Sequence, residues 1–164
     1  MKVLAFSDLH LSRGRAAALV EASREADLVI GAGDFCNMRE GLTEAIDLVT
    51  DITAPFVTVP GNSESADELR AAANPGMTVL HGDGVEIAEL RLFGLGYGIP
   101  PTPFGDWSCD MTEEDAKQML TACDSADIMV FHSPPKGIGD VTSQGMSVGS
   151  TAIRDAIARV APSL

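Results

Sequence analysis

Short apolar runs alternate with helical patterns along the first half of the chain. Residues 3–6, 27–30 and 56–59 each have the length and composition of a buried strand. A helical pattern follows each run. The first covers residues 12–25 and begins at the cap residue Ser12, and the second is indicated by the spaced apolar positions Leu42, Ile46 and Val49. The third begins with the capping-box pattern Ser65-x-x-Glu68 and reaches residue 73. Three strand-then-helix units predict a mostly parallel sheet covered by helices.

The pattern changes after residue 76. Residues 78–81 and 85–87 flank Gly82-Asp83-Gly84 and predict a hairpin that turns at these three residues. Further elements are expected in this order: a strand at 91–95, a long loop at 97–110, a helix from Thr112 to about Cys123, a buried strand at 127–131, a Gly-rich loop at 136–149 and a helix at 151–160. A length of 164 residues fits a single domain, 1–164.

Polar side chains gather where the apolar runs end. Asp8 and His10 follow the first run, Asp34 the second, Asn62 the third, and His132 the strand at 127–131. In sheets of this kind, ligands bind at the carboxyl ends of the strands. The spacing therefore predicts that these five residues share one site.

The donor types point to metal chemistry. The set contains carboxylate, amide and imidazole donors without a thiolate, which suits Mn, Fe, Zn or Mg. Asp34 could bridge two ions through its two carboxylate oxygens. A pair of divalent ions clamps attacking and leaving oxygens in phosphoryl displacement and lowers the pKa of bound water to about 7.

In these motifs the sequence resembles the calcineurin-like metallophosphoesterases. Asp8-Leu9-His10 matches the family's Asp-x-His, and Gly33-Asp34-Phe35-Cys36-Asn37 matches Gly-Asp-x-x-Asp/Asn. Gly61-Asn62-Ser63-Glu64 matches Gly-Asn-His-Asp/Glu apart from its histidine, and His132 matches the strand-end histidine. Four motifs in the family's order, spread over residues 3–132, are far more specific than any one of them.

The resemblance implies an α/β fold: a sandwich of two mixed β-sheets flanked by helices. It implies that Asp8, His10 and Asp34 hold a first divalent ion, and that Asp34, Asn62 and His132 hold a second. The implied activity is hydrolysis of a phosphomonoester or phosphodiester by metal-bound hydroxide, with Asp34, Asn62 and His132 as catalytic residues.

Two departures from the family pattern leave an alternative open. Ser63 replaces the histidine proposed to protonate the leaving group, and a serine is no general acid near neutral pH. The final Gly-His-x-His motif is absent, and the sequence stops at Leu164 after a helix, so we expect C-terminal strands to be missing. A partner chain, as in a homo-oligomer, could supply the missing part. The alternative is a scaffold protein that keeps the fold without turnover.

The amino-acid composition limits the kinds of molecule that this protein is expected to bind. The net charge is −13, from 24 acidic and 11 basic residues, and such an acidic chain repels nucleic acid and anionic membranes. A DNA nuclease stays open, because its affinity could come from the ions. No apolar run reaches the ~20 residues needed to span a bilayer, and three unpaired cysteines favour a reducing cytoplasm. We therefore expect a cytoplasmic protein that acts on a small phosphorylated substrate.

Some residues near the motifs have simpler explanations. Glu64 could fix the Asn62 loop or cap the next helix, and capping is the favoured interpretation. His81 is expected to be structural, and Cys36 to be a small buried filler. The aromatic residues at 97–107 could form a lid over the substrate or a packing cluster under a long loop.

Overall fold

The first sheet is formed by the N-terminal half of the chain. The computed structural model describes all residues from 1 to 164. Four strands pair in chain order and are parallel throughout: β1 (Val3–Phe6), β2 (Leu28–Gly31), β3 (Phe56–Thr58) and β4 (Met77–Val79). Three helices connect them: α1 (Arg13–Ser23), α2 (Leu42–Asp47) and α3 (Ala66–Ala72). The predicted parallel sheet is confirmed.

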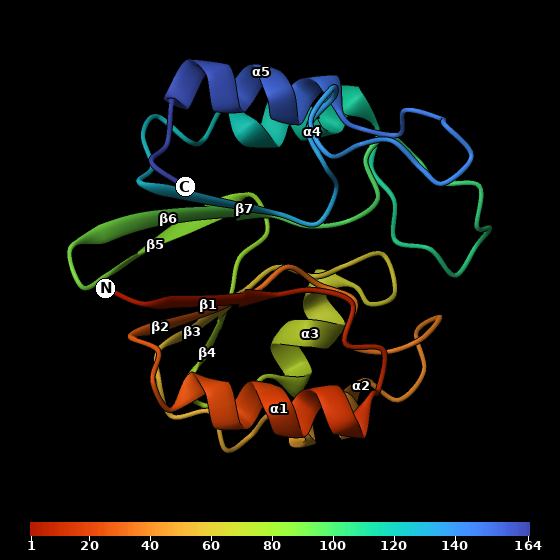
Figure 1. The fold of residues 1–164 in the computed structure, drawn as a ribbon. Coiled ribbons are helices and arrows are strands. Elements are labelled where there is room, and N and C mark those ends of the chain that lie inside the picture. Colours follow the sequence, from red (N-terminus) through yellow and green to blue (C-terminus); the bar gives the residue numbers. More distant parts are fainter.

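The second sheet is smaller and mixed. Strand β6 (Leu90–Leu95) lies between β5 (Asp83–Ile87), to which it is antiparallel, and β7 (Ile128–Phe131), to which it is parallel. Helices α4 (Glu113–Leu120) and α5 (Thr151–Val160) cover its outer face (Figure 1). The expected two-sheet sandwich is confirmed, with mixed pairing confined to this sheet.

The two sheets stack face to face, so the molecule has four layers: helices, sheet, sheet, helices (Figure 1). Eight buried apolar residues fill the space between the sheets: Leu28, Ile30, Val57, Val59, Leu80, Leu92, Ile128 and Val130. Two further buried clusters pack each sheet against its helices. Gly94 permits close packing of the sheets, because a Cβ there would lie 2.6 Å from Val59 Cγ1. Burial on both faces explains why the strands are continuous apolar runs.

The predicted hairpin at Gly82-Asp83-Gly84 is wrong. Strand β4 pairs with β3 in the first sheet, and the chain crosses to the second sheet between Val79 and Asp83, where β5 begins. The hairpin joins β5 to β6 instead, with Ile87 opposite Leu90 and a two-residue turn at Ala88 and Glu89. Both turn residues have positive φ, 50° and 67°, as a tight hairpin of this hand requires. Neither residue type favours that conformation, so the local sequence does not indicate this turn.

Helix caps agree closely with the sequence. Ser12 and Thr112 cap α1 and α4 through side-chain oxygens, and Ser65 with Glu68 forms the complete capping box of α3. Helix α2 ends at Asp47, earlier than the apolar spacing predicts. No helix has the length and apolar character required to cross a membrane.

Candidate metal centre

The loops after β1, β2 and β3 are held together by backbone contacts. The amides of Asp8 and His10 donate to the carbonyls of Gly33 and Asp34, at 3.0 and 3.1 Å. Asp8, His10 and Asp34 have φ of 55°, 47° and 60°, in the left-handed region that non-glycine residues seldom adopt. Backbone strain of this kind concentrates at functional sites, where the surrounding structure enforces it.

Glycines allow the two central loops to touch. Gly33 has φ +91°, and a Cβ there would lie 2.4 Å from the amide nitrogen of Gly61. A Cβ on Gly61 would lie 2.0 Å from Asp34 Oδ1. Both motif glycines are therefore required for close approach of the Asp34 and Asn62 loops.

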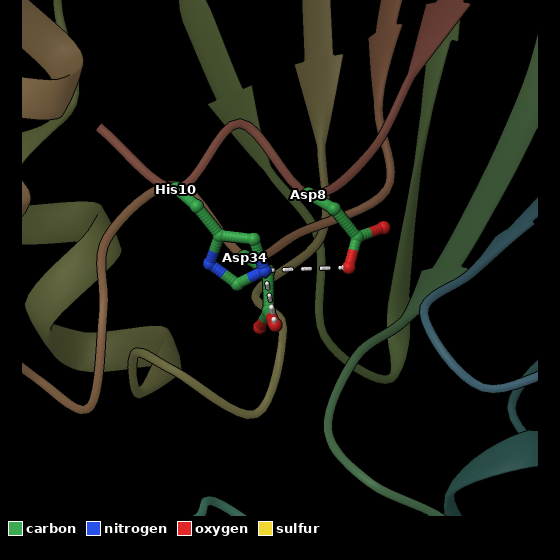
Figure 2. Close-up of side chains that lie close together, drawn as sticks. All are labelled: Asp8, His10 and Asp34. Atoms are coloured by element: carbon green, nitrogen blue, oxygen red, sulfur yellow. Dashed lines mark ion pairs between the residues drawn. The ribbon is translucent and has the colours of Figure 1, made fainter. Parts of the chain in front are cut away.

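One half of the site contains Asp8, His10 and Asp34. His10 Nε2 lies 3.6 Å from Asp8 Oδ1 and 3.6 Å from Asp34 Oδ2, and the three side chains converge (Figure 2). His10 Nδ1 is 3.0 Å from the Cys36 carbonyl. Because a carbonyl can only accept, Nδ1 donates to it, and this contact directs Nε2 toward the two carboxylates.

The other half contains Asp34, Asn62 and His132. His132 Nδ1 donates to the Ala32 carbonyl at 2.7 Å, and this contact directs Nε2 toward Asn62 and Asp34. That nitrogen lies 3.1 Å from Asn62 Oδ1 and 3.6 Å from Asp34 Oδ1. This half is the more enclosed one, because the side chain of His132 is 12% exposed whereas those of Asp8 and His10 are 54% and 39% exposed.

A polar network from the loop after β6 fixes the Asn62 amide. Asn62 Nδ2 donates to Ser108 Oγ at 3.0 Å, and Ser108 donates in turn to Asp110 Oδ1 at 3.0 Å. Thr102 Oγ1 is 2.9 Å from Ser108 Oγ and 3.1 Å from Asp110 Oδ2. With the amide nitrogen held by Ser108, Oδ1 must face His132. The sequence offered no pattern that marks these three residues.

The donor types fit a divalent cation, and Asp8, His10 and Asp34 alone place three ligand atoms within 4.8 Å of one another. In each half, one imidazole nitrogen faces two oxygen acceptors, and Asp34 supplies one carboxylate oxygen to each half. Two oxygens around one imidazole nitrogen form a cluster that either a proton on the nitrogen or a bound cation would hold together. Three ligands with an open position are typical of catalytic metal sites, and imidazoles oriented by carbonyls are typical of metal-binding histidines.

Glu64 joins two loops of the candidate site through hydrogen bonds. The interpretation of Glu64 as a helix cap is wrong. Its carboxylate, 0% exposed, accepts from the backbone amides of Gly61 and Asp34, at 2.7 and 2.8 Å, and from those of Phe35 and Cys36. Burial raises the pKa of Glu64, while these donors act in the opposite direction. Glu64 thus joins the loops after β2 and β3, and the cap of α3 is Ser65.

No free imidazole stands beside the five candidate ligands. Ser63 is 2% exposed, and its amide donates to Asp34 Oδ1 at 2.9 Å. His81 packs on Tyr97 with ring centroids 4.2 Å apart, accepts from the Gly96 amide, and has a pKa lowered by burial. Its structural role agrees with expectation, and Tyr97 belongs to this packed pair rather than to a lid.

Cys36 is buried, as expected for a filler. Burial and the nearby Glu64 carboxylate raise the pKa of its thiol to about 12. The thiol therefore stays protonated and donates to the Ser63 carbonyl at 3.0 Å. It is not a thiolate ligand.

Comparison with known proteins agrees with this geometry. The profile of the calcineurin-like phosphoesterase superfamily domain matches residues 1–136, so the chain belongs to that superfamily. Its members are generally metal-dependent phosphoesterases that bind divalent ions. No curated protein matches the sequence.

Solved structures share the fold. The crystal structure of TT1561 of Thermus thermophilus superposes with a TM-score of 0.77 at 17% identity, over 98% of this chain and 77% of that one. A second crystal structure gives the same TM-score and identity, over 98% and 80% of the two chains. At this identity the similarity establishes the fold alone.

Proposed function

We propose that the chain is a dinuclear metal-dependent phosphoesterase that hydrolyses a small phosphomonoester or phosphodiester. The observation that carries the proposal is the position of Asp34. Its two oxygens lie 3.6 Å from His10 Nε2 and 3.6 Å from His132 Nε2, on opposite halves of the site. A carboxylate between two open three-ligand sets is suited to bridging two ions.

Divalent ions bound there would supply a water of pKa near 7 and offset the negative charge of the phosphoryl group. The protein's own residues do the positioning. Asp8 and His10 would hold one ion from the β1 loop, and Asn62 and His132 would hold the other. Glu64 fixes the position of Asp34 relative to Asn62, because its carboxylate ties the β2 loop to the β3 loop.

The leaving group receives no proton from an imidazole of this chain. Ser63 occupies the position of the family's proton donor, and His81 is engaged with Gly96 and Tyr97. Since a serine does not act as a general acid near neutral pH, esters with acidic leaving groups are the preferred substrates. Rates should therefore fall steeply as the pKa of the leaving alcohol rises.

The test is hydrolysis of bis(p-nitrophenyl) phosphate and p-nitrophenyl phosphate with added Mn²⁺. Asp34→Asn should lower kcat by more than about 100-fold, exceeding the upper range for residues that merely support metal ligands. Asp47→Asn, an exposed carboxylate at the end of α2, is the matched control and should retain full activity. Equal activity of wild type and Asp34→Asn would contradict the proposal.

Ser63 also favours a second candidate, a scaffold that retains the fold without turnover. In that case the protein would bind two Mn²⁺ ions, as measured by equilibrium dialysis, and hydrolyse neither ester. Turnover that depends on Asp34 would exclude the scaffold.

A further inference from the structure

A pocket of about 380 Å³ opens directly beside the second half of the metal centre. Asn62 and His132 are part of its wall. The rest comes from two loops, one after β6 that includes Ile99 and Phe104, and one after β7 that reaches Val148. A wider hollow of about 700 Å³ lies beside α4, but none of the five candidate ligands lines it. Of these two pockets, only the one of about 380 Å³ is lined by candidate metal ligands.

The wall of this pocket carries no charged side chain. Apart from Asn62 and His132, it consists of prolines, small apolar groups, Phe104 and hydroxyl residues. Two of its hydroxyls are already engaged: Ser133 Oγ accepts from the Ile99 amide and donates to the Tyr97 carbonyl, and Ser147 donates to Asp140. Few free hydrogen-bonding groups remain, so the wall suits an uncharged and largely apolar ligand.

Large apolar side chains stand at the pocket while still facing water. Phe104 is 55% exposed and Val148 45% exposed. A bound ring would cover part of both side chains, and removing apolar surface from water favours binding. Phe104 also stacks on Trp107, with ring centroids 5.8 Å apart and planes 8° from parallel. Of the aromatic residues at 97–107, Phe104 therefore borders the site, and Trp107 supports it.

We propose that this pocket binds the organic group of the substrate, and that this group is an uncharged aromatic or heteroaromatic ring. The inference rests on the proposed phosphoesterase function and adds the substrate class. A volume of about 380 Å³ lies near the lower limit of ligand pockets, so it accepts a ring-sized group rather than a polymer. An aryl or heteroaryl alcohol is also an acidic leaving group, which agrees with the absence of a proton donor at Ser63.

The test compares binding of phenyl phosphate and methyl phosphate to the Mn²⁺-loaded protein by isothermal titration calorimetry. Phenyl phosphate should bind at least about tenfold more tightly, because the ring is buried. Trp107 is the only tryptophan, so its fluorescence should change with phenyl phosphate and not with methyl phosphate. Neither readout requires turnover.

Variants of pocket residues test whether the ring of phenyl phosphate binds in this pocket. Phe104→Ala and Val148→Asn should each reduce the preference for phenyl phosphate to about threefold or less, with methyl phosphate binding unchanged. Ile138→Ala is the matched control, since Ile138 is 67% exposed on the same loop as Val148 but does not line the pocket. Its preference should equal that of the wild type.

The outcomes separate the two levels of the proposal. Equal affinity for the two phosphates in the wild-type protein would overturn the pocket assignment and leave the phosphoesterase function intact. If neither phosphate binds to the Mn²⁺-loaded protein, the proposed function fails together with the pocket.

Discussion

The two halves of the metal centre are built in different ways. Asp8, His10 and Asp34 come from neighbouring loops of one parallel sheet and are placed by left-handed backbone conformations and mutual amide contacts. Asn62 and His132 come from different sheets, 70 residues apart, and meet only because the sheets stack. The first half depends on local chain geometry, and the second depends on tertiary packing.

Exposure differs in the same way. The side chains of Asp8 and His10 are 54% and 39% exposed, whereas that of His132 is 12% exposed. The enclosed half also has the additional support of the Ser108 network and borders the uncharged pocket. The exposed half therefore has freer access to solvent, and under the proposed function the enclosed half would contact the organic part of the substrate.

Removing one ligand from each half is the strongest way to test the comparison. His10→Ala and His132→Ala should each lower the number of bound Mn²⁺ ions from two to one, and Asp34→Asn should weaken both sites. Equilibrium dialysis with metal analysis measures this directly. We expect hydrolysis to fall by more than about 100-fold in all three variants, because both ions are needed. Loss of both ions in His10→Ala alone would show that the halves are not separate.

Glu64→Gln tests the hydrogen bonds by which Glu64 joins the loops after β2 and β3. In the variant, the NH₂ group of the glutamine side chain would face backbone N–H groups that donate to a carboxylate in the wild type. Because donors would then face donors, we expect the free energy of unfolding to fall by about 2–3 kcal/mol. Urea unfolding measures the change. Glu21→Gln, at an exposed position on α1, is the control and should have little effect. Unchanged stability of Glu64→Gln would show that the four amide contacts contribute nothing net.

Ser108→Ala affects only the enclosed half. Without Ser108 the Asn62 amide loses the contact that orients Oδ1, and the ion held with His132 should bind about 10–100-fold more weakly. The ion at Asp8 and His10 should keep its affinity, a difference that a general loss of stability would not produce. Ser108→Thr retains the hydroxyl and should restore binding. Equal weakening of both ions would contradict this positioning role.

The smallest expected effect concerns the ion pair between Arg39 and Glu68, in which Arg39 Nη2 lies 2.7 Å from Glu68 Oε1. Arg39 follows the Asp34 loop, and its amide donates to the Ser63 carbonyl. Arg39 holds the pKa of Glu68 at about 2, below its ordinary value of 4.5. A depressed pKa stabilises the fold above about pH 4.5, and this contribution disappears as the pH falls toward 2.

Both side chains are more than a third exposed, so solvent screening limits the contribution to under about 1 kcal/mol. Glu68→Gln removes the charge and keeps the capping box. Unfolding free energies of the two proteins should differ by a constant small amount above about pH 5 and converge near about pH 2. A difference that grows toward low pH would have the wrong sign.

The turn chemistry shows where sequence reasoning failed. Gly82-Asp83-Gly84 has the composition of a hairpin turn, yet Gly82 ends the crossing between the sheets, and Asp83 and Gly84 already pair within the second sheet. Ala88 and Glu89 make the actual hairpin although neither residue favours a positive φ. Pairing of β5 with β6 forces that conformation on them, and local propensity cannot reveal a constraint set by pairing.

Glu64 is a similar case. Its place before a helix and its charge indicated a cap. Only the approach of the Asp34 loop, made possible by Gly33 and Gly61, surrounds it with backbone donors from a segment 30 residues away. The Ser108 network has no signal in the sequence for the same reason, since Ser108 is 46 residues from Asn62.

The sequence by itself determined the strand-and-helix order, the parallel first sheet and the residues offered as ligands. These follow from apolar periodicity and from the rule that parallel strands end at a common edge. The tertiary structure decided that Asp34 faces both halves, that Ser108 orients Asn62, and that an uncharged pocket adjoins His132. The physical reason is that strand periodicity is short-range information, whereas side-chain convergence depends on how two sheets and their long loops pack.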